Sequence, residues 1–127
     1  MKKIYLSLKS EYFNSIATEK KIFEGRLYKG KYRSIHVGDN LLFINIEDKN
    51  DNRMLKVIVS SIHIFPTFEN AFMSIKNTLA VPNHSLNETL KIYYSFYPKK
   101  IVKKHGVVFY GIKLVKIFHK KFINKKV

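Results

Sequence analysis

The sequence predicts an α+β fold built on a curved, largely antiparallel sheet with flanking helices. The predicted elements follow the order strand, helix, strand, hairpin, two helices and a long strand, which does not alternate as a parallel βαβ protein would. The chain has 127 residues, of which 46% are hydrophobic, and this is enough for one core. We therefore predict a single domain over residues 1–127, with a basic C-terminal end at about 118–127.

The first two strands flank a short helix. Apolar and polar side chains alternate over residues 3–8, which is the period of a half-buried strand. Ser10 can cap the helix that follows, and we expect that helix to end near Glu19. Residues 21–28 return to an extended pattern. Gly25 inside this second strand predicts a bulge, or a close approach by another backbone or a ligand.

The middle of the chain predicts a loop, a turn and a hairpin. Residues 29–34, KGKYRS, form a basic loop suited to meeting phosphates. The turn residues Gly, Asp and Asn at 37–40 lead into an apolar strand at 41–47. A polar loop at 48–52 then connects to a returning strand at 55–65, which is rich in β-branched residues.

Two helices and a long strand complete the prediction. Thr67 caps the first helix, whose apolar side chains continue to Leu79. The motif SLNE at 85–88 is a capping box, and its helix stops before Pro98. An aromatic cluster, YYSFY, ends that helix just before a lysine-rich segment. Residues 107–118 are apolar on both faces, which suits a central or barrel strand.

The charge of the chain is large and uneven. It carries 24 Lys and Arg residues against 9 Asp and Glu residues, a net charge of +15. Every charged residue after Glu88 is a lysine, so the C-terminal third is the basic surface expected to attract a polyanion. A lysine-rich composition also produces solvated basic faces with no ligand, and this alternative stays open.

Several classes of site are disfavoured by what the sequence lacks. There is no cysteine, the five histidines are not spaced as metal ligands, and neither a GxSxG elbow nor a glycine-rich phosphate loop is present. We predict no metal and no cofactor. Neither a signal peptide nor a bilayer-spanning segment is found. The predicted location is intracellular and cytoplasmic, or nuclear if the source is eukaryotic or viral.

Opposed charges, glycines and aromatic residues meet at fixed spacing only in residues 18–39. Glu24 and Arg26 lie two apart in an extended run, so both project from one face of the strand. Burying one of them alone would cost several kcal/mol. The pair therefore lies either at a solvated rim or inside a pocket, where the two charges satisfy each other.

This segment resembles the signature of the activating-signal-cointegrator homology (ASCH) domain, a branch of the PUA-like superfamily. The shared order is Lys21, two apolar residues, Glu24, one residue, Arg26 and a basic loop that leads to IHVGD at 35–39. The resemblance implies that the three charged side chains converge on one concave site.

The resemblance covers about residues 3–117, although only the segment 20–39 is specific. The family often has a glycine before the two lysines and a small hydroxyl residue after them, where this chain has Glu19 and Ile22. For the fold, the resemblance implies a PUA-like, largely antiparallel β-barrel of about five or six strands, with helices beside a cleft.

Two functions follow from the basic cleft. The first is a module that binds RNA or another nucleic acid through the cleft, with the C-terminal lysines adding non-specific attraction. The predicted phosphate contacts are Lys20, Lys21, Arg26, Lys29, Lys31 and Arg33, and the predicted base-stacking residues are Tyr28 and Tyr32.

The second function is a small hydrolase acting on a modified nucleoside, or a ribonuclease. In the branch that resembles bacterial N4-acetylcytidine amidohydrolases, a lysine matching Lys21 acts near a threonine, and Glu24 stands at that threonine position. A buried Lys21 with a lowered pKa would serve as base or nucleophile while Glu24 orients a water. Alternatively, Lys21 supplies charge to a binding cleft whose shape Glu24 and Arg26 maintain, and we favour this interpretation because charge pairs are more often structural.

Overall fold

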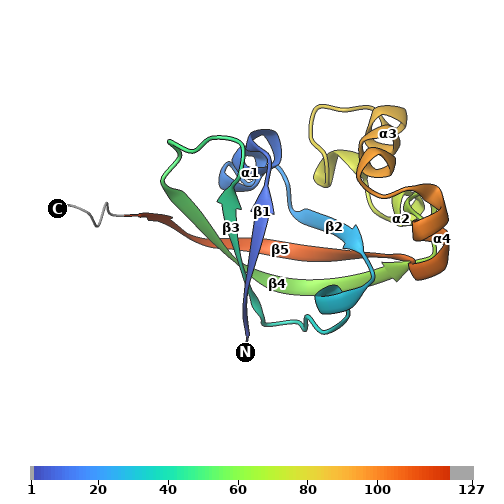
Figure 1. Ribbon diagram of the computed structural model, residues 1–127, viewed down its shortest axis with the longest axis horizontal. Coiled ribbons are helices and arrows are strands. Elements are labelled where there is room, and N and C mark those ends of the chain that lie inside the picture. Colours follow the sequence, from blue (N-terminus) through green and yellow to red (C-terminus); the bar gives the residue numbers. More distant parts are fainter. Residues whose placement is uncertain (1, 121–127) are drawn as a thin grey trace.

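The computed structural model describes residues 2–120, which form one five-stranded sheet and a set of helices (Figure 1). The elements are β1 (Lys3–Leu8), α1 (Ser10–Ala17), β2 (Phe23–Leu27), the 3-10 helix η1 (Gly30–Arg33), β3 (Asn40–Asn45), β4 (Arg53–Phe65), α2 (Phe68–Ser74), the 3-10 helix η2 (Asn77–Leu79), α3 (Leu86–Phe96), α4 (Lys99–His105) and β5 (Val107–His119). The fold is therefore α+β, as predicted.

The sheet is mixed and open. Its strand order is β1-β3-β4-β5-β2, in which β1 pairs with β3 in parallel and the other three pairs are antiparallel. The strands β1 and β2 are the two edges, and within residues 2–120 no ladder joins them, so the predicted barrel is not confirmed. The Arg26 side chain of β2 instead reaches the Ser7 carbonyl oxygen of β1 across the gap, at 3.3 Å.

Helices pack on the sheet in two groups. Helix α1 lies beside β1 and β3, whereas α2, α3 and α4 gather at the far end of the long β4–β5 pair (Figure 1). Phe13 and Ile16 of α1 are buried in the first core with residues from β1, β3, β4 and β5. Phe68, Tyr93 and Phe109 belong to the second core, in which the Phe68 and Tyr93 rings stack with centroids 4.5 Å apart.

Gly25 is explained by a side chain and not by a bulge. The register of β2 against β5 is continuous, and Gly25 pairs with Phe109. A Cβ atom on Gly25 would lie 2.5 Å from Phe109 Cε2 and 3.0 Å from the Tyr93 hydroxyl. Glycine is therefore needed because the Phe109 ring packs directly over this backbone. Of the two alternatives predicted for Gly25, the bulge is not found in this pairing, and the close approach is made by an aromatic ring and not by another backbone or a ligand.

The predicted helices are found, with changes in length. The capping box is present: Ser85 Oγ accepts from Glu88 N at 3.1 Å, and Ser85 N donates to the Glu88 carboxylate at 2.8 Å. The helix capped by Thr67 ends at Ser74 and not near Leu79, because the chain turns extended at Ile75 before entering η2. The basic loop at 29–34 contains η1, which was not predicted.

Helix α4 was also missed. Its lysines favour a helix but show no apolar periodicity, since Val102 is its one buried residue. Pro98 precedes the helix, and Gly106 ends it with a φ of 74°.

None of the helices in residues 2–120 combines the length and apolar character that crossing a membrane requires. Of the predicted basic end at 118–127, residues 121–127 lie outside the part of the chain that the structure describes.

Candidate functional site

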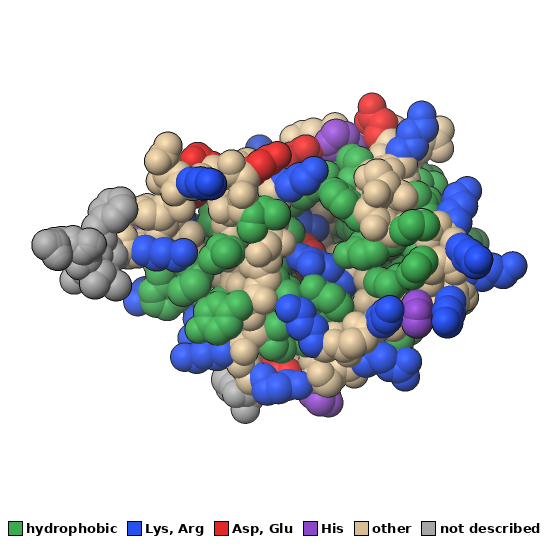
Figure 2. Space-filling view, in the orientation of Figure 1, with side chains coloured by type: hydrophobic (Ala, Val, Ile, Leu, Met, Phe, Trp, Pro, Cys, Tyr) green, Lys and Arg blue, Asp and Glu red, His purple; other side chains and the backbone are tan. Residues whose placement is uncertain are grey.

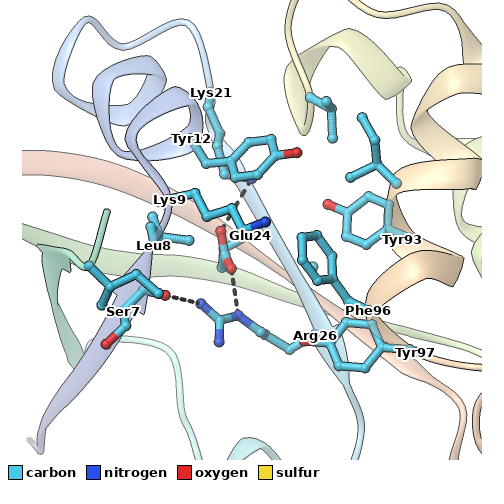
Figure 3. Close-up of a pocket in the computed structure, with 14 residues that line it drawn as sticks. Ser7, Leu8, Lys9, Tyr12, Lys21, Glu24, Arg26, Tyr93, Phe96 and Tyr97 are labelled. Atoms are coloured by element: carbon cyan, nitrogen blue, oxygen red, sulfur yellow. Dashed lines mark hydrogen bonds and ion pairs between the residues drawn. The ribbon is translucent and has the colours of Figure 1, made fainter. Parts of the chain in front are cut away.

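A pocket occupies the gap between the two edge strands of the open sheet. Its volume is about 170 Å³, and it is lined by the end of β1, the start of α1, the middle of β2 and one face of α3. Figure 2 shows the hollow near the centre of this face of the molecule, with charged side chains at its floor. One wall is charged and the opposite wall is aromatic (Figure 3).

The charged wall consists of Lys21, Glu24 and Arg26. Alternation along β2 puts Glu24 and Arg26 on one face, and Lys21 precedes the strand by two residues. Arg26 Nε donates to Glu24 Oε2 at 2.6 Å, and Lys21 Nζ lies 3.2 Å from Glu24 Oε1. The predicted convergence of these three residues on one concave site is confirmed, while their roles in binding or catalysis stay predictions.

Lys21 is held by the backbone. Its Nζ donates to the carbonyl oxygens of Phe23 at 2.6 Å and Ala80 at 2.7 Å, and its side chain is only 3% exposed. Burial lowers the pKa of Lys21, and the charge of Glu24 opposes that shift. Two carbonyl acceptors and a carboxylate stabilise the ammonium form, in which the nitrogen has no lone pair for nucleophilic attack.

Glu24 is the buried anion between the two cations. Burial acts to raise the pKa of Glu24, but the charges of Lys21 and Arg26 outweigh it, so the pKa lies below its ordinary value. The contact of Oε1 with Lys21 is an ion pair without hydrogen-bond geometry. Among the buried side-chain nitrogen and oxygen atoms of residues 2–120, Glu24 Oε1 is the one without a hydrogen-bond partner.

Arg26 connects the pocket to its surroundings. Besides its bonds to Glu24 and Ser7, its guanidinium donates to the Tyr32 hydroxyl of η1 at 2.8 Å. The charge of Glu24 raises the pKa of Arg26 even though burial lowers it. A guanidinium has more N–H donors than these three bonds use. Arg26 therefore keeps donors for a ligand, and the charged wall, in which Lys21 and Arg26 face Glu24, has one more positive charge than negative.

The opposite wall is aromatic. Tyr93 and Phe96 project from α3, Tyr97 follows directly after this helix, and Tyr12 of α1 faces them (Figure 3). Lys9 Nζ lies 5.3 Å from the centre of the Phe96 ring, so a cation and an aromatic side chain meet across the pocket. Burial raises the pKa of Tyr93 well above its ordinary value, which keeps this phenol protonated at neutral pH.

The other predicted contact residues lie outside the pocket. Lys20 is exposed and does not line it. The Arg33 guanidinium lies 4.8 Å from the Tyr28 ring centre, and the cations of Arg26 and Lys31 lie 5.4 and 5.6 Å from the Tyr32 ring centre. The Tyr28 and Tyr32 rings, which were predicted to stack on bases, thus already contact cationic side chains of the same chain. The remaining predicted residue, Lys29, is exposed beside η1.

The aromatic wall of the pocket was not predicted from the sequence. The cluster at the end of α3 was visible as a run of aromatic residues, but no local signal placed it opposite β2. No sequence pattern marked Lys9 or Tyr12 as part of a site, because the start of α1 reaches the pocket only in the folded chain. In the part of the chain that the structure describes, no three His, Asp or Glu side chains are grouped so as to hold a metal ion.

Solved structures resemble this chain in sequence and fold. The crystal structure of hypothetical protein PH0355 is 33% identical, with a TM-score of 0.77, over 91% of this chain and 100% of that one. The solution NMR structure of protein PF0455 from Pyrococcus furiosus is 30% identical, with a TM-score of 0.72, over 90% and 98% of the two chains. Among curated proteins, no sequence matches this chain.

A more distant structure shares the fold alone. The crystal structure of ASCH from Zymomonas mobilis is 10% identical, with a TM-score of 0.59, over 87% of this chain and 66% of that one. The family model of the ASCH domain matches residues 6–116, which include the motif of Lys21, Glu24 and Arg26. The resemblance found in the sequence is thereby confirmed. The chain belongs to the ASCH domain family.

Proposed function

We propose that the protein binds RNA or another nucleic acid and holds one unstacked base in the pocket between β2 and α3. The ASCH family is generally linked to RNA binding, which agrees with a chain of net charge +15. Sequence-specific RNA recognition mostly uses bases that are splayed out of the strand and stacked on aromatic side chains. The pocket supplies the aromatic wall that such a base needs.

The size of the pocket suits a single ring system. A cavity of about 150 Å³ accommodates one benzene molecule in an engineered protein core, and the volume here is about 170 Å³. A whole nucleotide does not fit in that volume. The sugar and phosphate of a bound nucleotide would therefore stay at the mouth, where Lys9 and Arg26 are available.

The observation that carries the proposal is Glu24 Oε1. This buried carboxylate oxygen has the Lys21 ammonium 3.2 Å away as an ion-pair partner, but no hydrogen bond, so it keeps capacity to accept one. A ligand with an N–H edge would satisfy this acceptor, and spare Arg26 donors would meet an adjacent carbonyl or ring nitrogen. Nucleobases present such donors and acceptors side by side.

Binding of a labelled single-stranded RNA, measured by fluorescence anisotropy, tests this proposal. Phe96 lines the pocket and is 46% exposed, so Phe96→Ala should leave the fold intact. We expect it to weaken binding by about 1–3 kcal/mol, the typical contribution of one stacked base. Met73→Ala is the matched control, because Met73 is 84% exposed on α2 and does not line the pocket. Equal affinities for wild type and Phe96→Ala would refute the base pocket.

A second candidate is hydrolysis of a modified nucleoside or of RNA. The observation in its favour is a lysine with a lowered pKa buried beside a carboxylate in a pocket. Reaction would require Lys21 to lose a proton and give up its two carbonyl contacts. Incubation of the protein with N4-acetylcytidine and with RNA distinguishes this candidate from binding alone, and the expected outcome is given below.

A further inference from the structure

We propose that the surface formed by η1 and α4 binds the phosphate backbone of an RNA strand that continues out of the pocket. This inference rests on the proposed function and narrows it, because the ligand would then be a strand and not a free nucleoside. The cationic surface is defined by Lys29, Arg33 and Lys104, together with His105. Lys29 and Arg33 belong to the η1 segment, and Lys104 belongs to α4, which is far from η1 in the sequence.

The two segments are fastened together by the backbone. Tyr28 N donates to the Gly106 carbonyl oxygen at 3.0 Å, so the chain entering η1 is fixed to the end of α4. Gly106 adopts a φ of 74°, and a Cβ atom there would lie 2.9 Å from the Phe65 carbonyl oxygen. The junction is therefore closely packed, and the cations around it are carried by a preorganised backbone.

The cations are near one another and lack acidic partners. Burial is the largest cause of the lowered pKa of His105, and the positive charges of three neighbouring side chains lower this pKa further. They are Lys29, Lys104 and Arg33. All three are exposed, and among the described residues no carboxylate lies within ion-pair distance of them. No acidic residue follows Glu88 in the sequence.

A structural explanation accounts for only part of this cluster. Lys103, Lys104 and His105 lie in the last turn of α4, where cations favourably meet the negative end of the helix dipole. Lys29 and Arg33 belong to a different segment, so the dipole of α4 does not explain why they are gathered here. Like charges held together without a counter-charge are expected where a polyanion binds.

The surface is connected to the pocket. Tyr32 of η1 accepts from the Arg26 guanidinium at 2.8 Å, and Arg26 lines the pocket. Figure 2 shows Lys and Arg side chains below the central hollow and around the α4 end of the molecule, with no acidic side chain over α4 on this face. A strand leaving the pocket past Arg26 therefore meets η1 first and then α4. Arg33 is already held against the Tyr28 ring, which reduces the entropy lost when it contacts a phosphate.

Charge reversal with a matched control tests the surface. The variant carries Lys29→Glu, Arg33→Glu and Lys104→Glu, and the control carries Lys3→Glu, Lys49→Glu and Lys113→Glu, which change the net charge equally at exposed sites away from η1 and α4. Circular dichroism checks that both fold. The probe is a fluorescein-labelled single-stranded RNA of about ten nucleotides, within the range that small domains occupy.

We expect the η1–α4 variant to lose RNA affinity well beyond the control. The slope of log affinity against log salt should fall by about 2, because each phosphate contact on a single strand contributes roughly 0.7. If the two triple variants show equal losses of RNA affinity and equal decreases in salt dependence, the η1–α4 surface contributes only through the net charge of the protein. The inference is then wrong. Binding to phosphatidylserine vesicles that is lost in the η1–α4 variant, with RNA affinity unchanged, would also overturn it.

The same assays separate this inference from the proposed function. If Phe96→Ala weakens RNA binding while the η1–α4 variant behaves like its control, the pocket stands and the surface is wrong. If Phe96→Ala has no effect while the η1–α4 variant loses affinity, the surface stands and the pocket is wrong.

Discussion

Arg26 Nε donates to Glu24 Oε2 over 2.6 Å, while the other carboxylate oxygen of Glu24 accepts no hydrogen bond. The pair combines a strong charge-assisted bond with a second carboxylate oxygen that is held by an ion pair alone. Lys21 neutralises the carboxylate from the other side, at 3.2 Å, without closing that acceptor. The same three residues thus keep the gap between β1 and β2 charged.

Neutralising Glu24 should destabilise the protein. Glu24→Gln leaves the buried charges of Lys21 and Arg26 without an anion, so we expect the free energy of unfolding to fall by about 3–5 kcal/mol in urea denaturation. Glu19→Gln, at an exposed position outside the pocket, is the control. A change in Glu24→Gln no larger than about 0.5 kcal/mol, the range of ordinary surface substitutions, would contradict a mutually satisfied pair.

Adding one methyl group at Gly25 should also be costly. In Gly25→Ala the new Cβ atom would lie 2.5 and 2.6 Å from two atoms of the buried Phe109 ring. We expect a loss of about 1–3 kcal/mol in the free energy of unfolding, as for other overpacked cores. Gly30→Asn serves for comparison, because nothing lies within 4 Å of a Cβ there and asparagine tolerates its φ of 61°. Equal stability of Gly25→Ala and wild type would show that the ring is not fixed over this strand.

Acid should weaken the contact between the β3–β4 hairpin and α1. Asp51 accepts from Arg53 Nε at 2.9 Å and from its terminal nitrogen at 2.8 Å, and Arg53 also donates to Asn14 of α1 at 2.6 Å. These hydrogen bonds lower the pKa of Asp51 from its ordinary 3.8. When the pKa of a carboxyl group is lower in the folded protein than in the unfolded chain, the ionised group stabilises the fold. This stabilisation is complete above the pKa of the unfolded chain and is lost as the pH falls toward the pKa of the folded protein.

Asp51→Asn therefore has a defined pH signature. We expect it to reduce the free energy of unfolding by about 1 kcal/mol at neutral pH, and to make the decline of stability below pH 3.8 less steep. Chemical denaturation across a pH series measures both effects, with Asp48→Asn as the exposed control from the same loop. If Asp51→Asn and wild type lose stability in parallel on acidification, Asp51 does not carry this dependence.

We expect the protein to show no turnover. Lys21 donates to two carbonyl oxygens and pairs with Glu24, and these contacts favour the protonated amine. Purified protein should release no acetate from N4-acetylcytidine and should leave RNA uncleaved, as followed by chromatography and gel electrophoresis. Robust hydrolysis that disappears in Lys21→Met, in a variant still folded by circular dichroism, would establish the hydrolase instead.

Features that depend on near neighbours along the chain could be predicted from the amino-acid sequence. Alternation along a strand placed Glu24 and Arg26 on one face, and the cost of burying a lone charge required that they be paired. The capping box at Ser85 and Glu88 followed from hydrogen-bond chemistry within one helical turn. Both patterns involve residues separated by a few positions, for which geometry is set by the backbone alone.

The residues that face the charged strand could not be predicted in this way, because they come from distant segments of the chain. Tyr12 and Phe96, which are far apart in the sequence, both line the pocket beside β2. A backbone hydrogen bond between Tyr28 and Gly106 joins the segment that carries Lys29 to the end of α4, which carries Lys104. The open gap between β1 and β2, where a barrel was expected, depends on strand pairing across the whole sheet. These contacts are made by packing between segments distant in sequence, and neither periodicity nor composition encodes which distant faces will meet.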